Sequence, residues 1–190
     1  MFREQIGDGY RGTAATIEKM HLLTRLAVEG VGPSGTDDDR VLRLAREIVQ
    51  PVAAKDYRGE VAAIFLWCQT NLRYVRDPWT PGGVERLQHP AVTLFESRGG
   101  DCDELAPAFS ALCASIGAPW AFETVGVDPL QPNEFLHVYS LVHVDGEWVA
   151  ADISFANVPL GWEPPADDPR FQPGVARTGV VKVYARDWPP

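Results

Sequence analysis

The sequence has few cysteines, and they follow no recognised spacing. Cys68, Cys102 and Cys113 form no Cys-x-x-Cys pair, and the four histidines form no His-x-x-x-His pair, which excludes the common zinc-binding modules. An odd number of cysteines outside a disulfide framework is typical of free thiols in a reducing compartment. We therefore expect a cytoplasmic protein with no metal and no cofactor.

Positive charge is also scarce, with 17 Lys and Arg against 26 Asp and Glu and a net charge of −9. Nucleic acids and anionic membranes select basic surfaces, so neither is an expected partner. The N-terminal residues lack the basic and then apolar pattern of a signal peptide, and no apolar run approaches the ~20 residues that a membrane-spanning helix needs. The expected partner is a protein or peptide substrate, and the oligomeric state stays open.

What the sequence does have is the apolar content of one globular domain, 45% over 190 residues, which we take as a single unit, 1–190. Its first half has apolar residues at helical spacing. The expected helices are residues 13–29, a helix capped by Thr36 with Asp37, Asp38 and Asp39 in its first turn, residues 59–74, and a short helix over 90–96. The third is so apolar that we expect it to be buried on most sides, with Trp67 and Cys68 in the core.

The second half changes to strands after one more helix, 102–117. Residues 120–127, 135–144 and 147–153 are rich in aromatic and branched side chains, and Asp145-Gly146 is a two-residue hairpin turn. A proline-rich, irregular stretch over 155–177 precedes a last strand, 180–185. Helices followed by an antiparallel sheet predict an α+β fold, with the 102–117 helix packed on the sheet.

The stretch Gly99-Gly100-Asp101-Cys102 places a thiol at the start of that helix, with Asp101 as the expected N-cap. Unpaired N–H groups and the helix dipole at this end favour a thiolate, and the same N–H groups can bind an oxyanion that forms beside the sulfur. The neighbouring acids Asp101, Asp103 and Glu104 oppose a thiolate. A reactive Cys102 therefore needs a histidine as its positive partner.

The hairpin register selects one histidine. A two-residue turn at 145–146 sets His143 opposite Trp148 and places His137 and Asp152 as diagonal neighbours on one face, with Cβ atoms ~7 Å apart. That spacing allows the hydrogen bond between imidazole and carboxylate that a catalytic base uses. His143 lies about 20 Å farther along the strand and cannot share this acid. Taken alone, His137 and Asp152 are each better explained by a structural role.

Taken together, these residues resemble the transglutaminase-like superfamily, which has the papain-like cysteine fold, and in particular its compact bacterial and phage-associated members. The resemblance rests on Gly-Asp-Cys-Asp-Glu at 100–104, Phe-Leu-His-Val-Tyr at 135–139 and Trp-Val-Ala-Ala-Asp at 148–152, in the family's order. It covers about residues 50–155 and leaves 1–49 as a helical N-terminal extension.

The resemblance implies that Cys102 is the nucleophile, His137 the general base and acid, and Asp152 the residue that orients the imidazole. The implied reaction is acyl transfer at an amide through a thioester, completed by hydrolysis or transamidation. The backbone N–H of Cys102 is a natural oxyanion donor, and Gln88 and Trp79 are candidates for a second. Calcium dependence does not carry over, because no calcium loop is evident.

Two alternatives stay open. One is a catalytically silent scaffold with the same fold, such as an assembly component of a phage or prophage. The other is a metal site in which Cys102, His137, Asp152 and Glu104 hold a zinc ion with an open position.

Overall fold

The computed structural model describes residues 10–76, 87–128, 131–163 and 182–184. Trp79 lies outside the described residues, as does the part of the proline-rich stretch after residue 163. In the described part of the chain, no helix combines the length and the apolar character needed to cross a bilayer.

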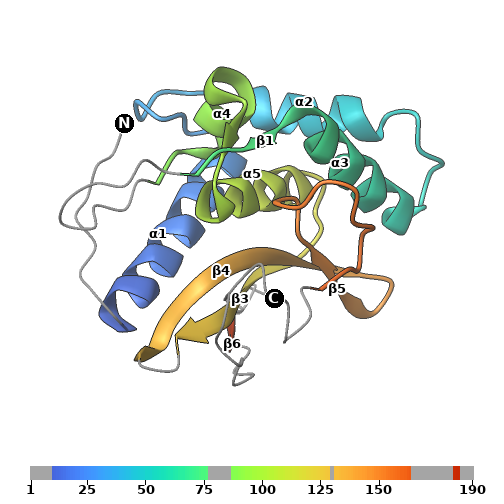
Figure 1. Cartoon of the computed structure of the whole chain (residues 1–190). Coiled ribbons are helices and arrows are strands. Elements are labelled where there is room, and N and C mark those ends of the chain that lie inside the picture. The colour runs from blue at the N-terminus through green and yellow to red at the C-terminus, as the bar shows by residue number, and fades with distance from the viewer. Residues whose placement is uncertain (1–9, 77–86, 129–130, 164–181, 185–190) are drawn as a thin grey trace.

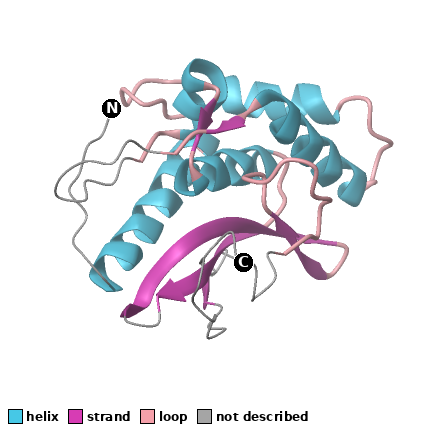
Figure 2. Ribbon diagram, viewed as in Figure 1, coloured by secondary structure: helices cyan, strands magenta, loops and turns pink. Residues whose placement is uncertain are grey.

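Helices make one layer of the molecule (Figures 1 and 2). They are α1 (Tyr10–Val28), α2 (Arg40–Val49), α3 (Tyr57–Asn71), α4 (Pro90–Val92), which continues as the π-helical turn η1 (Thr93–Ser97), and α5 (Cys102–Ser115). The helix predicted over 90–96 therefore exists but is α-helical only in its first turn. Pro90 occupies its first position, where the missing N–H costs no hydrogen bond.

An antiparallel sheet makes the other layer. Its strands β3 (Trp120–Asp128), β4 (Gln131–Val144), β5 (Glu147–Ala151) and β6 (Lys182–Tyr184) lie in the order β5-β4-β3-β6. A separate parallel pair joins β1 (Arg73–Tyr74) to β2 (Gly99–Gly100), just before α5. The predicted α+β fold with a helix packed on an antiparallel sheet is confirmed.

Helix α5 lies between the other helices and the sheet (Figure 1). Phe109 and Leu112 are fully buried in a cluster that includes side chains of α2, α3, β4 and β5. On the side of the sheet, the Ser110 and Ser140 hydroxyls are 2.9 Å apart, and Ser140 donates to the Ala106 carbonyl at 3.0 Å. Burial on all sides explains why this helix is mostly apolar on every face beyond its acidic first turn.

Helix α1 belongs to the same packed body. Ile17, Met20 and Leu23 are buried against Trp120 and Phe122 of β3. Their spacing of three residues brings them onto one face of the helix. Residues before the motif-bearing region thus cover part of the sheet.

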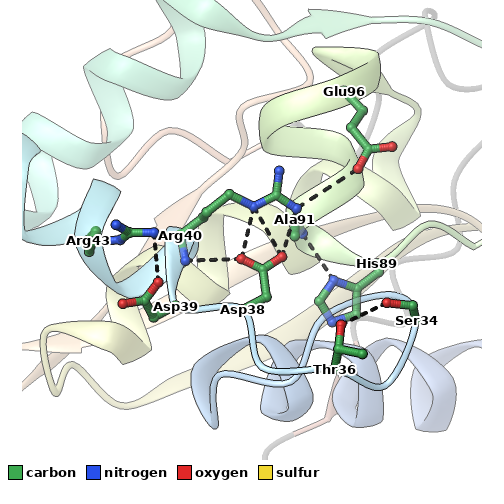
Figure 3. Close-up of polar contacts among 9 residues, drawn as sticks. All are labelled: Ser34, Thr36, Asp38, Asp39, Arg40, Arg43, His89, Ala91 and Glu96. Carbon is green, nitrogen blue, oxygen red and sulfur yellow. Dashed lines mark hydrogen bonds and ion pairs between the residues drawn. The ribbon is translucent and has the colours of Figure 1, made fainter.

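The second helix begins later than the sequence predicts, because Asp38 has a better partner than the helix dipole. Helix α2 starts at Arg40 with Asp39 as N-cap, so the predicted acidic first turn is wrong. The Arg40 side chain donates to Asp38 Oδ1 at 2.9 Å and to Oδ2 at 2.7 Å (Figure 3). Thr36 bonds to Ser34 instead of capping the helix. A two-pronged contact between full charges is stronger than attraction to partial charges at a helix end.

The third helix is shorter and more exposed than the sequence predicts. Helix α3 ends at Asn71, because the backbone of residues 73–75 pairs with residues 98–100. Cys68 is fully buried as predicted, but Trp67 is only partly buried, with the Arg98 guanidinium 5.8 Å from its ring centre. Leu66 is 64% exposed. One face of the helix therefore packs on the core and the other meets solvent.

Candidate functional site: a thiol, an imidazole and a carboxylate

Cys102 is the first residue of α5, and Asp101 occupies the N-cap position as the sequence predicts. The side chain of Cys102 is half-buried. The two residues of β2 that precede Asp101, Gly99 and Gly100, are held by pairing with β1. The thiol therefore lies at the N-terminus of a helix, and the chain segment that leads into this helix is held in place.

The buried carboxylate of Glu104 fixes the first turn of α5. Its Oε2 accepts the Asp101 backbone N–H at 3.2 Å, and its Oε1 accepts the Gln88 side-chain amide at 2.6 Å. Gly100 makes this arrangement possible, because a Cβ at that position would collide with the Glu104 carboxylate. Glu104 is thus a buried cap that ties α5 to the segment before α4, rather than an exposed partner of the dipole.

His137 and Asp152 meet as the hairpin register predicts. The ladder between β4 and β5 sets Val144 opposite Glu147 and His143 opposite Trp148. His137 Nε2 lies 2.7 Å from Asp152 Oδ2, and both side chains are buried. The other carboxylate oxygen of Asp152 accepts the Ser154 N–H at 3.0 Å, which holds the carboxylate in place.

The third member of the group, Cys102, lies close enough to His137 for its thiol to raise the pKa of the imidazole. Because Nε2 faces Asp152, Nδ1 is the ring nitrogen that is left for the sulfur. Burial disfavours the imidazolium, but the interactions with Asp152 and Cys102 outweigh it and raise the pKa of His137 to about 10. The imidazole is therefore suited to carry a positive charge beside a thiolate.

Aromatic side chains surround the imidazole. The Phe155 ring lies edge-on to the His137 ring, with 5.6 Å between the ring centroids. The Tyr139 ring is stacked on the His137 ring, with 6.1 Å between the centroids. Phe155 packs in turn on Trp162, at 5.3 Å. The Gln69 side chain anchors this segment by donating to the Phe155 carbonyl at 3.1 Å. The ring is thus held in one orientation from several sides.

The other cysteines and histidines lie elsewhere. Burial raises the pKa of the Cys68 and Cys113 thiols, which keeps them neutral in the core. His143 packs against Trp148 at the hairpin end of β4, which agrees with its predicted exclusion. His21 and His89, which the sequence left without a role, are buried: His21 packs on Trp120, and His89 accepts the Ala91 N–H to cap α4 (Figure 3).

The sequence does not predict several contacts within the site. The Gln88–Glu104 contact joins positions 16 residues apart, and Phe155 comes from a stretch predicted only as irregular. Tyr139, which stacks beside the imidazole, is the register partner of Glu123 of β3, a pairing that depends on the sheet order. A buried glutamate in the capping-box position, three residues after Asp101, was the one available hint.

The zinc alternative finds no support in the geometry. Across the described ranges, no three His, Cys, Asp or Glu side chains are grouped so that they could hold a metal ion.

Comparisons with known proteins agree with this fold. The model of the transglutaminase-like superfamily matches residues 43–153, whereas no curated protein matches the sequence. A candidate protease from Parabacteroides distasonis superposes with a TM-score of 0.50 at 16% identity, over 74% of this chain and 26% of its own. A candidate cysteine protease from Cytophaga hutchinsonii superposes with a TM-score of 0.47 at 19% identity, over 78% of this chain and 47% of its own.

Calcium-bound LapG from Legionella pneumophila superposes with a TM-score of 0.46 at 13% identity, over 89% of this chain and 87% of its own. The chain thus spans about half of the Cytophaga protein and a quarter of the Parabacteroides protein. At these identities the likeness concerns the fold alone. The family model, by contrast, covers more than half of the sequence and includes all three residues of the site. The chain belongs to the transglutaminase-like superfamily.

Proposed function

We propose that the protein is a cysteine enzyme that transfers the acyl group of an amide, in a peptide bond or a glutamine side chain, through a thioester. Cys102 is the nucleophile, His137 the general base and acid, and Asp152 the residue that orients the imidazole. The observation that carries the proposal is the buried pair of His137 and Asp152, 2.7 Å apart, with the Cys102 thiol close to the imidazole at the N-terminus of α5. Family membership supports the same chemistry.

The reaction follows from the positions of these groups. The Cys102 sulfur attacks the carbonyl carbon, and the electron pair of the C=O bond moves onto oxygen. When the C=O bond re-forms, the C–N bond breaks and the amine leaves with a proton from His137, so a thioester remains. His137 then takes a proton from water or from an acceptor amine as that molecule attacks the thioester carbon. The C–S bond breaks, the acyl product leaves, and the Cys102 sulfur departs as a thiolate beside the imidazolium. Asp152 stabilises the imidazolium throughout.

The expected substrate is a protein or peptide. The net charge of −9 favours a neutral or basic one, because like charges would repel an acidic chain. The free cysteines support a reducing, cytoplasmic location. The chief competing role is that of a scaffold, for example in phage assembly, in which the same three residues have no catalytic use.

The first test is alkylation by iodoacetamide at neutral pH, followed by mass analysis of each cysteine. We expect Cys102 to react much faster than a free thiol, and Cys68 and Cys113 to stay unmodified because both are buried. The fast reaction is expected to disappear in His137→Ala and to persist in His143→Ala, which removes a histidine outside the site. Labelling of Cys102 at the rate of a free thiol would favour the scaffold.

The second test separates the two outcomes of the reaction. A peptide library is incubated with the protein, with and without a primary amine, and the products are weighed by mass spectrometry. Cleavage or deamidation that needs Cys102 indicates hydrolysis, whereas incorporation of the amine with loss of ammonia or of a peptide fragment indicates transamidation. If the wild-type protein leaves the library unchanged under both conditions, the result would contradict the proposal that the protein is an enzyme.

A further inference from the structure

Tyr74 lies on β1, the strand that pairs with the segment leading into Cys102. In the parallel pair of β1 and β2, Tyr74 is the register partner of Gly100, which precedes Cys102 by two residues. The pairing is tight, since the Val75 N–H donates to the Gly100 carbonyl at 2.8 Å and the Arg73 N–H donates to the Arg98 carbonyl at 3.1 Å. Tyr74 therefore keeps a fixed position relative to the start of α5.

The hydroxyl of Tyr74 is an available hydrogen-bond donor. The side chain is 48% exposed, so it is not sealed in the core. Partial burial, together with the negative charges of Cys102 and Asp101, raises the pKa of Tyr74 to about 12. The phenol thus keeps its proton at neutral pH. The positive charge of Arg76 acts on the pKa of the phenol in the opposite sense, and a nearby cation favours hydrogen-bond donation by the O–H group.

The proposed reaction calls for more than one donor where the carbonyl oxygen becomes negative. The Cys102 N–H at the helix start is one such donor. Gln88, a candidate from the sequence, directs its amide nitrogen to the Glu104 carboxylate at 2.6 Å. Trp79, the other candidate, lies outside the described residues. Tyr74 remains as a polar side chain that is close enough to Cys102 for a negative charge on the sulfur to raise the pKa of the phenol.

We propose that the Tyr74 hydroxyl is the second oxyanion donor, acting beside the Cys102 backbone N–H. This inference rests on the proposed function. As the sulfur attacks, the C=O electron pair moves to the carbonyl oxygen, which accepts hydrogen bonds from both groups. No proton changes place in these two contacts. When the C=O bond re-forms and the leaving group departs, the hydrogen bonds weaken again, so the donor stabilises the transition state more than the substrate.

Two reactions of the same sulfur can test this role. p-Nitrophenyl acetate acylates the thiol through a tetrahedral oxyanion and releases p-nitrophenolate, which is followed by absorbance. Iodoacetamide alkylates the thiol by displacement of iodide at a saturated carbon, and no oxyanion forms. Both rates are measured on the full chain in the wild type, Tyr74→Phe, and the control Tyr57→Phe, which removes an exposed hydroxyl at the start of α3. Cys102→Ser gives the background.

In Tyr74→Phe we expect acylation to slow by about 10- to 100-fold and alkylation to stay unchanged, since one oxyanion donor commonly contributes a factor of this order or more. Tyr57→Phe should match the wild type in both reactions. Unchanged acylation in Tyr74→Phe overturns the inference, and so does an equal loss of both rates, which would assign Tyr74 to the state of the thiol. If wild-type acylation does not exceed that of Cys102→Ser, the proposed function itself fails, and the inference with it.

Discussion

At the scale of single residues, the pair of His137 and Asp152 decides how the site behaves. Burial by itself would keep the imidazole neutral, because removing a cation from water is costly. The observed contacts reverse that balance, so the pKa of His137 rises from 6.5 to about 10. The buried carboxylate of Asp152 in turn has the imidazole at 2.7 Å. Each group can therefore stay charged in the interior only because the other carries the opposite charge beside it.

This balance predicts how stability depends on pH. A folded-state pKa above the unfolded value means that the stabilisation is complete below pH 6.5 and is lost as the pH rises through about 10. In His137→Gln, the free energy of unfolding should fall below that of the wild type by several kcal/mol at pH 6, at most about 5, and by much less at pH 10. Urea denaturation at both pH values measures the two differences.

His143→Gln is the control for that experiment, because it removes a histidine on the same strand outside the pair. Its effect on unfolding should be small and should change little with pH. A difference between wild type and His137→Gln that is as large at pH 10 as at pH 6 would contradict the raised pKa.

At the scale of elements, the start of α5 depends on one buried acid. Glu104 accepts hydrogen bonds from the Asp101 N–H and from the Gln88 amide, and it is only 1% exposed. The first contact closes the helix N-terminus, and the second joins it to the segment that leads into α4. Because Cys102 lies between Asp101 and Glu104, this arrangement also sets the direction of the thiol and of its backbone N–H.

Removal of that acid should therefore cost both stability and reactivity. We expect Glu104→Ala to lower the free energy of unfolding by about 1–3 kcal/mol, since it leaves buried donors without their acceptor. It should also slow alkylation of Cys102. Urea denaturation and iodoacetamide kinetics measure the two effects. Glu47→Ala, at an exposed position in α2, should change neither. Equal unfolding curves for Glu104→Ala and the wild type would refute this role.

At the scale of the whole molecule, the N-terminal helix is part of the core although it precedes the family match, which begins at residue 43. Met20 is fully buried against a cluster that includes Trp120 and Phe122, and α1 also packs on α5. The helix therefore supports the same sheet that carries His137.

Truncation of Met20 measures this support. We expect Met20→Ala to destabilise the protein by about 2–5 kcal/mol, because it removes buried methylene groups and leaves a cavity. Leu22→Ala on the same helix, at a position 42% exposed, should cost far less. Thermal or urea unfolding compares the two variants. Similar small losses for both would mean that α1 is a detachable extension.

The sequence by itself determined the features that depend on near neighbours along the chain. Asp145 and Gly146 both adopt positive φ, 53° and 84°, as a two-residue hairpin turn of this type requires. That turn fixes the register, and the alternation of side chains then places His137 and Asp152 on one face. Likewise, Asp101 ahead of an apolar run was enough to place the start of α5 and the thiol in it.

Only the tertiary structure decided which distant groups meet. Helix α3 ends at Asn71 because the chain beyond it pairs with residues 98–100, and α2 starts at Arg40 because Asp38 binds the arginine. The proximity of Cys102 to His137, and that of Tyr74 to Cys102, likewise bring separate segments together. Such contacts depend on how whole helices and strands pack against one another. That packing is a collective property of the core, which local preferences along the chain do not encode.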